Sequence, residues 1–233
     1  MTLPRSRNET YVDGTTQIPA ATMNDIQDKI ILLHGMLRGS GFHVRDDFPA
    51  TIGGAVDTHK WVPGSGGTGV APIIVDDSAA GGFGAVQFAA GASGGTSEAL
   101  ITKLAIGTKD LYVSCRVRRA TAVGTSMHFT VGFIGDAGAA DDLAFRGFMG
   151  GNWQRKLGAT TTDDLGVAMS STYQFLEMWR ISGVVYFAID GTTLYSGAFA
   201  DDLGVGFFEL RLFEGSAVAN QINVDMVSVW VDR

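Results

Sequence analysis

The sequence predicts an all-β domain built as a sandwich or jelly roll, and three observations support this fold class. From Phe42 onward, about a dozen short apolar runs follow one another at fairly regular spacing, with no helical pattern between them. In Val184–Ile189 the side chains of every second residue share one face, which is the period of a half-buried strand. The 32 glycines of the chain supply the many tight turns that such a fold needs.

The stretch Thr172–Phe199 is predicted to form a β-meander with which the rest of the domain pairs. Ser182-Gly183 and Asp190-Gly191 separate its strands, and such pairs supply the positive φ values of tight hairpins. The strands predicted across the chain are Phe42–Phe48, Trp61–Val62, Ile73–Val75, Gly84–Phe88, Leu100–Ile106, Leu111–Arg118, Met127–Ile134, Leu143–Phe148, Tyr173–Ile181, Val184–Ile189, Leu194–Gly197, Phe207–Phe213 and Gln221–Val231. The glycine-rich intervals Gly64–Gly69 and Gly91–Gly95 are predicted to be loops.

Two predicted strands differ in how their faces are covered. In Phe207–Phe213 the apolar side chains at 208, 210 and 212 face one way, and Glu209 and Arg211 face the other. One face of this strand is therefore core, and the other is wet or lies at an interface. Tyr173–Ile181 is apolar on both faces near its centre, which is typical of a strand covered on its outer side as well.

Composition and charge exclude several classes of protein. The net charge is -7 and 18% of the residues are charged, so nucleic acid is not expected to be the main partner. No run of about 18 apolar residues occurs, and no apolar leader follows Met1, so neither membrane insertion nor a signal peptide is expected, and synthesis is expected in the cytoplasm. The single cysteine, Cys115, lies in phase with the apolar side of its strand and is predicted to be a buried structural thiol.

The chain divides into an N-terminal segment, residues 1–40, and a β-sandwich domain, residues 41–233, with the boundary at Gly39–Gly41. Residues 1–19 carry no periodic apolar pattern and are predicted to form an extended arm. Such an arm is held either by an assembly partner or by a neighbouring part of the same subunit.

One short helix is predicted after the arm. Thr22 caps its first turn, and Asp25 lies where the helix dipole favours a carboxylate. Two heptads cannot hold a free coiled coil together, so the helix either packs on its own domain or shares its seam with symmetry mates in a homo-oligomer. Ile30 at an a-like position favours more than two chains, so a trimer is the favoured oligomer. The seam consists of Met23, Ile26, Ile30, Leu33 and Leu37.

The N-terminal segment resembles that of many tailed-bacteriophage tail, baseplate and fibre proteins. Those proteins often carry an aromatic-x-Asp-Gly stretch, then small residues and a Leu/Met-Asn-x-Ile helix. The matching residues are Tyr11, Asp13, Gly14, Met23, Asn24 and Ile26. This resemblance implies a virion protein, on the head or tail, that docks through its arm.

Residues 42–233 resemble the concanavalin A-like lectin/glucanase jelly roll. The matching features are Asp46-Asp47-Phe48 followed by Trp61, the turn at Asp190-Gly191, and a closing strand with the pattern Val-Asp-x-Val-x-Val from 224 to 229. The resemblance implies the fold, and it leaves the function open because the same sandwich serves lectins, hydrolases and virion proteins.

The chemistry that glycoside hydrolases need is not visible in the sequence, so we expect no enzyme. Hydrolases on this fold place paired carboxylates on one strand, but none of the five glutamates has a carboxylate two residues away on the same face. Glu177 is the best single candidate for a buried acid, although an ion pair or an interface contact suits it better. The string Gly64-x-Gly66-x-x-Gly69 opens no helix, and the histidines lack metal-ligand spacing.

Five Asp-Asp pairs lie at predicted strand ends or loops. Oxygen-rich loops can bind Ca²⁺, and a turn-capping role is the favoured alternative. No other cofactor is expected. The pairs are Asp46-Asp47, Asp76-Asp77, Asp141-Asp142, Asp163-Asp164 and Asp201-Asp202.

Residues 150–158 are predicted to form a polar loop that carries the recognition site. Trp153 would stand exposed among donors from Asn152, Gln154 and Arg155 and would contact a glycan or a partner protein. The alternative is that Trp153 is a core residue.

The leading hypothesis is a structural component of a bacteriophage virion. It docks through its arm and displays a lectin-like jelly roll for assembly or host-surface attachment, as a tail fibre, baseplate or capsid-decoration protein. Its partners are then other virion proteins and a host-surface glycan. The alternative is a free-standing glycan-binding lectin module or adhesin, and a polysaccharide hydrolase is disfavoured.

Overall fold

The computed structural model describes most of the β-sandwich domain and two short segments before it. The described residues are 11–12, 17–18, 41–48, 52–67, 69–80, 84–90, 95–121, 128–135, 142–148, 151–158, 161–214 and 220–232. The predicted helix with its seam, Met23 to Leu37, lies outside the described residues, as does most of the predicted arm. Within the arm, β1 (Tyr11–Val12) pairs with β2 (Gln17–Ile18) in a small antiparallel ladder.

The domain itself is built from strands in antiparallel pairs. They are β3 (Gly41–Asp46), β4 (Val62–Gly67), β5 (Val70–Val75), β6 (Ala85–Ala90), β7 (Gly95–Ala105), β8 (Leu111–Arg119), β9 (His128–Ile134), β10 (Leu143–Phe148), β11 (Asn152–Leu157), β12 (Thr161–Ala168), β13 (Gln174–Ile181), β14 (Val184–Ile189), β15 (Thr192–Ala198), β16 (Val205–Glu214) and β17 (Asn220–Asp232). A single 3₁₀ turn, Ser78–Ala80, is the one helical element among the described residues, and no helix there has the length and hydropathy to cross a membrane.

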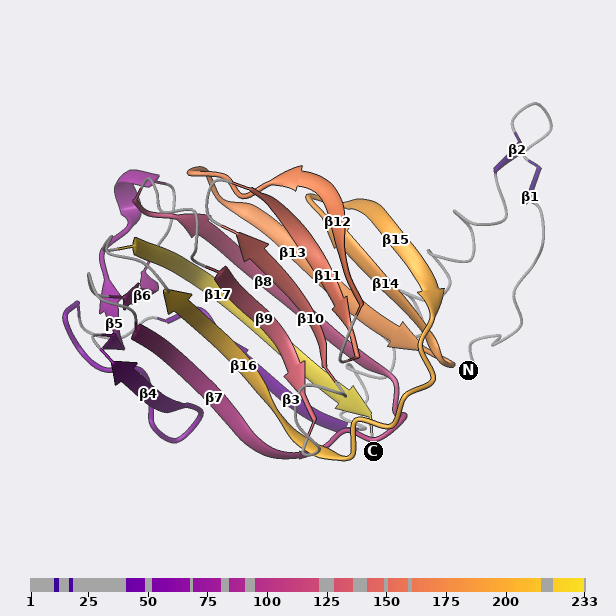
Figure 1. Ribbon diagram of the computed structural model, residues 1–233, viewed down its shortest axis with the longest axis horizontal. Coiled ribbons are helices and arrows are strands. Elements are labelled where there is room, and N and C mark those ends of the chain that lie inside the picture. The colour runs from indigo at the N-terminus through magenta and orange to yellow at the C-terminus, as the bar shows by residue number, and fades with distance from the viewer. Residues whose placement is uncertain are drawn as a thin grey trace.

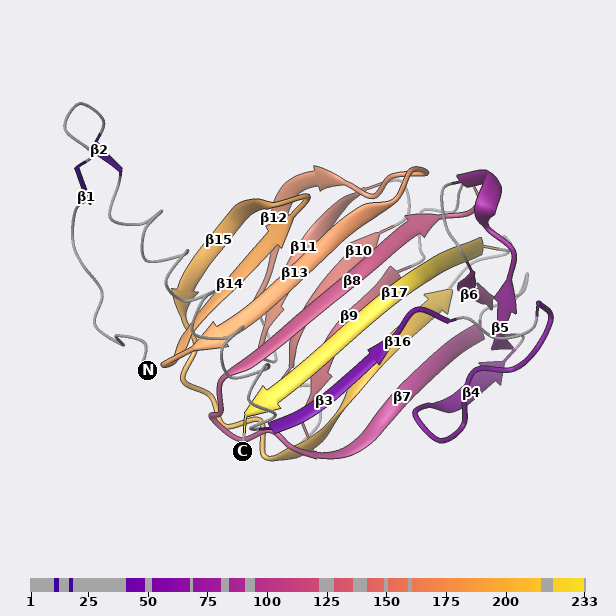
Figure 2. The ribbon, with the colours of Figure 1, turned by 180° about the vertical axis from the view of Figure 1, so that it is seen from behind.

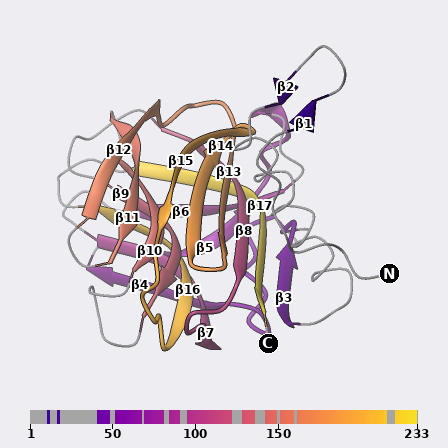
Figure 3. The same cartoon turned by 90° about the vertical axis from the view of Figure 1, so that its right-hand side faces the viewer.

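The strands form two layers, as the sequence predicts. One sheet has the order β12-β11-β10-β9-β16-β7-β4 and faces the viewer in Figure 1. The other has the order β15-β14-β13-β8-β17-β6-β5, with β3 also pairing with β17, and faces the viewer in Figure 2. Figure 3 shows the two layers from the side. We call them the seven-stranded and the eight-stranded sheet.

The main core lies between the sheets and is made by alternating side chains. Along β8 the residues at 111, 113, 115 and 117 are fully buried, while those at 112, 116 and 118 are only partly covered. Cys115 has no exposed surface, and burial raises the pKa of its thiol, so the predicted structural thiol is confirmed. Aromatic rings of the opposite sheet fill the same layer, among them Phe145, which meets Phe187 edge-on at a ring distance of 4.9 Å.

The predicted meander is confirmed as β13-β14-β15. At its two turns, Ser182 and Asp190 have φ of 49° and 50°, and the glycines after them have φ of 76° and 78°. Because left-handed backbone is costly for most residues with a side chain, these positions suit Gly and the small polar residues found there.

Three sequence-based assignments are wrong. The glycine-rich interval after Val62 is not a loop up to Gly67, because it forms the edge strand β4 through pairing with β7. The polar residues 152–157 and 161–168 are not loops either, since they form β11 and β12 at the other edge of the seven-stranded sheet. In each case strand pairing outweighs weak local propensity.

A second, smaller apolar cluster lies on the outer face of the eight-stranded sheet. Trp179 and Tyr186 stack there with ring centroids 5.1 Å apart and planes inclined by 8°. Ile181, Ala188 and Trp230 complete the buried part of the cluster. Strand β13 therefore buries apolar side chains on both faces, as the sequence predicts.

Candidate ligand-binding cleft

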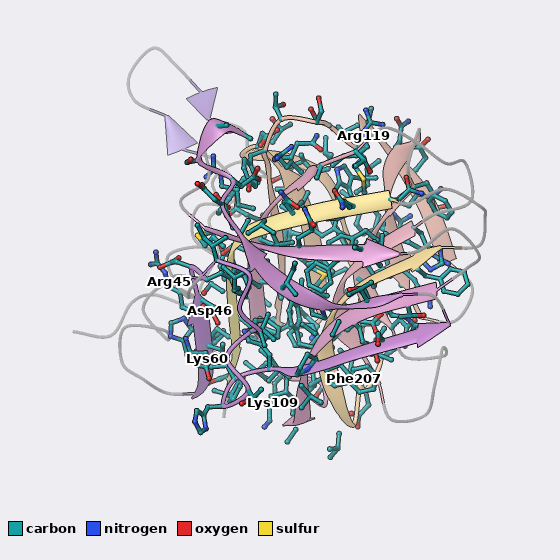
Figure 4. All side chains as sticks on the ribbon, turned by 90° about the vertical axis from the view of Figure 1, so that its left-hand side faces the viewer. Arg45, Asp46, Lys60, Lys109, Arg119 and Phe207 are labelled. Carbon is teal, nitrogen blue, oxygen red and sulfur yellow. The ribbon has the colours of Figure 1, made fainter. Side chains whose placement is uncertain are left out.

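A cleft of about 330 Å³ lies on the outer face of the seven-stranded sheet. The two faces of β16 produce it: Phe208, Leu210 and Leu212 point into the core, and the alternate residues point outward. This confirms the predicted division of the strand. The cleft is lined by His128, Thr130, Ile134, Asp142, Arg146, Lys156, Phe207, Glu209, Arg211 and Phe213, which come from β9, β10, β11, β16 and the residue before β10. Figure 4 labels Phe207 among them.

Two small residues lie in the sheet beneath the charged side chains of the cleft. Strand register places Gly132 opposite Ala144 in the row that joins Lys156 on one side to Glu209 on the other. A Cβ atom on Gly132 would lie 2.4 Å from the Leu143 carbonyl oxygen and 2.5 Å from Ala144 Cβ, so a larger residue does not fit without moving the strand. Both residues are buried, so the cleft is lined by the larger side chains around them.

Two further rows of side chains cross the same strands, next to the row of Gly132 and Ala144. The first is charged and polar and joins Gln154, Arg146, Thr130, Arg211 and Glu98 across β11, β10, β9, β16 and β7. The second is aromatic: His128 lies between Phe148 and Phe213, with its ring 5.9 Å and 5.0 Å from theirs. Phe213 is 37% exposed. The sheet face therefore presents an apolar rim and a charged row around the cleft.

Glu209 is the most perturbed acid of the cleft. It is only 4% exposed, and burial raises the pKa of its carboxyl to about 7. Arg211, 3.8 Å away, opposes this rise in pKa, while Asp142 and Glu98 add to it. Glu209 is therefore about half protonated at neutral pH and presents both a donor and an acceptor.

The other carboxylates of the cleft are bound by cations. Asp142 forms an ion pair with Lys156, and Glu98 lies 3.9 Å from Arg211. One oxygen of Asp142, Oδ1, is buried and accepts no hydrogen bond from the described residues.

Arg146 differs from these cations. Its Nη2 lies 3.1 Å from Nε2 of His128, and its guanidinium lies over the Phe148 ring at 5.3 Å. Its Nε is buried without an acceptor, and no ion pair joins Arg146 to a carboxylate within the described ranges. Burial lowers the pKa of Arg146, and the positive charge of Arg211 lowers it further, while Asp142 and Glu209 oppose this shift.

The residues of the site predicted from the sequence lie on both faces of β11. Trp153 has no exposed surface, its Nε1 donates to Oε1 of Gln174 at 2.9 Å, and its ring meets Phe145 edge-on at 6.2 Å. The prediction of an exposed Trp153 is wrong, because residues 152–157 form a strand and every second side chain turns inward. Arg155 also turns inward, with its guanidinium 3.6 Å from the centre of the Tyr195 ring.

Gln154 lies opposite Arg146 in the charged row, on the outer face. Nδ2 of Asn152 donates to Asp164 at 3.0 Å. The sequence-based prediction named Gln154 on this strand but did not include Arg146, Glu209 and Arg211, which line the cleft from β10 and β16. The alternation of β16 was the one available signal, since the pairing of four separate strands leaves no local pattern.

The Asp-Asp pairs serve turns and ion pairs. Asp46 accepts hydrogen bonds from Nε1 of Trp61 and from the amide of Phe48, each at 2.9 Å, and lies near Lys60 (Figure 4). Asp164 and Asp202 accept from amides two residues later, as in Asx turns. No group of three His, Cys, Asp or Glu with metal-binding geometry occurs in the part of the chain that the structure describes.

The chain matches no protein-family model and no curated protein sequence. It does match solved structures. A sialidase superposes with a TM-score of 0.60 at 13% identity over 81% of this chain, which spans 18% of the sialidase chain. A pseudo β-1,3-glucanase of Mycobacterium tuberculosis gives a TM-score of 0.61 at 14% identity, covering 84% of this chain and 100% of that one. The carbohydrate recognition domain of Emp47p gives 0.56 at 9% identity, covering 82% and 96%.

The two antiparallel sheets and these matches define the fold as a concanavalin A-like/glucanase jelly roll. The fold expected from the resemblance of residues 42–233 is confirmed. Two of the residues that carried the resemblance are in contact, since the Asp46 carboxylate binds the Trp61 indole.

Proposed function

We propose that the chain is a glycan-binding module and that the cleft on the seven-stranded sheet is its binding site. The single observation that carries this proposal is the arrangement of that sheet face, where aromatic rings and charged donors and acceptors line a cleft of about 330 Å³. A sugar ring needs an apolar surface for its C–H face and paired donors and acceptors for its hydroxyls. The cleft offers both.

Each part of the cleft has a role in this proposal. Phe213 and His128 form the apolar rim against which a ring can pack. Lys156 and Arg211 donate hydrogen bonds, and Glu209 and Asp142 accept them. The similar structures, which include a carbohydrate recognition domain and a pseudo β-1,3-glucanase, support the same function.

A glycan array followed by titration of the best ligands tests the proposal. The wild-type chain is expected to bind at least one class of glycan, and Phe213→Ala is expected to weaken it about tenfold, which corresponds to about 1.4 kcal/mol. Val205→Ala, at a 53% exposed position of the same strand outside the cleft, is the matched control. Absence of glycan binding by the wild-type chain, or equal binding by both variants, contradicts the proposal.

A polysaccharide hydrolase is the second candidate, and the specific observation in its favour is Glu209. A buried glutamic acid with a pKa near 7 is suited to protonate a leaving oxygen, and Asp142 lines the same cleft. Asp142 is, however, bound by Lys156, so we propose binding without turnover. Release of reducing ends from any polysaccharide, lost in Glu209→Gln, would establish the hydrolase instead.

The virion role is a finer proposal that rests on the resemblance of residues 11–26 alone. No virion protein is among the similar structures named above. A chain lacking residues 1–40 is expected to keep glycan binding while losing incorporation into a phage particle and losing the favoured trimer, which electron microscopy and light scattering measure.

A further inference from the structure

We infer that the cleft selects a sugar that carries a carboxylate, and that Arg146 is the residue that binds this carboxylate. The inference rests on the proposed glycan-binding function and adds the class of ligand to it.

The pairing of charges within the cleft identifies Arg146 as the anion-binding group. Lys156 is paired with Asp142, and Arg211 lies between Glu209 and Glu98 at 3.8 Å and 3.9 Å. Arg146 completes no ion pair with a described residue. The cleft therefore holds one guanidinium whose charge is balanced at contact distance by no carboxylate of the described residues.

The environment of Arg146 makes this unbalanced charge costly in the empty cleft. Burial removes part of the water that would solvate the guanidinium, and Arg211 adds repulsion, which is why the pKa of Arg146 is lowered. Arginine stays charged in proteins even so. An anion placed in the cleft would compensate both effects, whereas a neutral sugar would compensate neither.

The guanidinium is also held ready for a planar anion. The guanidinium lies over the Phe148 ring at 5.3 Å, and Nη2 lies 3.3 Å and 3.1 Å from Nδ1 and Nε2 of His128. Nη1 has no hydrogen-bond partner among the described residues. A guanidinium held in this way matches the geometry of a carboxylate, and hydrogen bonds between charged groups are about twice as strong as neutral ones.

The position of Arg146 within the cleft suits an acidic sugar rather than an isolated anion. Arg146 lines the cleft of about 330 Å³ together with Lys156 and Glu209, which leaves room for a sugar ring beside the guanidinium. A pyranose ring in the cleft would bring a carboxylate on its ring to Arg146. Its hydroxyls would then face Lys156 and Glu209.

The test compares matched glycans on the full-length chain. The array carries glycans that end in uronic or sialic acids, the carboxyl-reduced counterpart of each, and sulfated glycans. Wild type is expected to bind the carboxylated form at least tenfold more tightly than its reduced counterpart, and this comparison needs no variant. Arg146→Gln is expected to lose this preference, and Arg146→Lys, which keeps the charge without the planar fork, to retain only part of it.

Arg45→Gln is the control, since Arg45 is an exposed arginine of β3 in the other sheet (Figure 4). Melting curves establish that each variant is folded. Equal binding of carboxylated and reduced glycans overturns the inference and leaves the proposed function standing, as does tighter binding of sulfated glycans. A chain that binds no glycan on the array overturns both.

Discussion

The outer face of the seven-stranded sheet and that of the eight-stranded sheet differ in how far their polar groups are satisfied. On the eight-stranded sheet, Asp77 accepts hydrogen bonds from Arg118, Tyr173 and Asn223. Arg116 forms an ion pair with Asp225. Arg116 and Arg118 thus each have a carboxylate partner, although Oδ1 of Asp225 is buried without a donor among the described residues.

On the seven-stranded sheet the charges are only partly matched. Arg146 has a ring nitrogen and an aromatic face as partners but no carboxylate, and Asp142 keeps one buried oxygen without a donor. Matched groups stabilise a fold, whereas groups with unused capacity cost stability and are kept where a ligand completes them. The lack of a carboxylate partner for Arg146 among the described residues is therefore the difference that favours the seven-stranded sheet as the proposed binding face.

The pKa values of the buried acids follow their donors rather than the face on which they lie. Burial alone would raise the pKa of Asp77, but hydrogen bonds from Arg118, Tyr173 and Asn223 outweigh burial and hold this pKa below its usual value. For Glu209 burial dominates, and the pKa rises to about 7. Burial also raises the pKa of Asp225, on the eight-stranded sheet, to about 6, although Arg116 opposes this rise.

The largest expected effect tests whether the side chains of β11 alternate between the core and the cleft side of the sheet. Trp153→Ala is expected to lower the free energy of unfolding by about 3–5 kcal/mol, because it leaves a large cavity and removes the donor to Gln174. Gln154→Ala, the next residue of β11 and on the outer face, is expected to change it by less than about 1 kcal/mol. Urea denaturation measures both. Similar losses of unfolding free energy for the two variants would show that the side chains of β11 do not alternate in this way.

The next effect concerns Glu209 and depends on pH. The pKa in the folded state, about 7, lies above the usual value of 4.5, so ionisation of Glu209 opposes folding. Its unfavourable contribution is absent below about pH 4.5, grows between pH 4.5 and 7, and is complete above pH 7. Glu209→Gln is therefore expected to stabilise the fold by about 3 kcal/mol at pH 8 and to have little effect at pH 4.

Glu177→Gln provides the matched control for this measurement. Glu177 lies on the outer face of the eight-stranded sheet and accepts a hydrogen bond from the Tyr112 hydroxyl at 2.9 Å. Its substitution is expected to stabilise the fold at neither pH. If the difference in stability between Glu209→Gln and wild type were the same at pH 8 and at pH 4, the pKa of Glu209 would not be raised.

The sequence predicts the fold well because one face of most strands is buried. Alternation in the runs from 111 to 118 and from 207 to 213 reports that burial directly, and the Ser-Gly and Asp-Gly pairs report the hairpins. The sequence-based prediction fails for β11 and β12. Their polar residues lie near the sheet edge and form strands because they pair with neighbouring strands.

The site could not be predicted to the same degree. Arg146 lies in a predicted strand, but its neighbours His128 and Arg211 are 18 and 65 positions away in the sequence and meet it only through strand order. Glu209 has no carboxylate two residues away on its own strand, whereas Glu98 interacts with it from the adjacent strand β7 and Asp142 from the residue before β10, two strands away. The small row beneath the cleft is equally non-local, since it depends on Ala144 lying opposite Gly132.

The last prediction has the smallest expected effect, and it compares the stability cost of substituting two arginines, one on each sheet. Arg118 binds Asp77 and its side chain is 15% exposed, so Arg118→Gln is expected to cost about 2–3 kcal/mol by leaving Asp77 without its main partner. Arg146→Gln loses a contact with Phe148 worth about 0.5–1 kcal/mol but also removes an uncompensated, half-buried charge. These terms nearly cancel, so the free energy of unfolding of Arg146→Gln, measured by urea denaturation, is expected to differ from that of wild type by less than about 0.5 kcal/mol. A loss as large as that of Arg118→Gln would mean that Arg146 is a structural residue, and the seven-stranded face would then be as fully matched as the other.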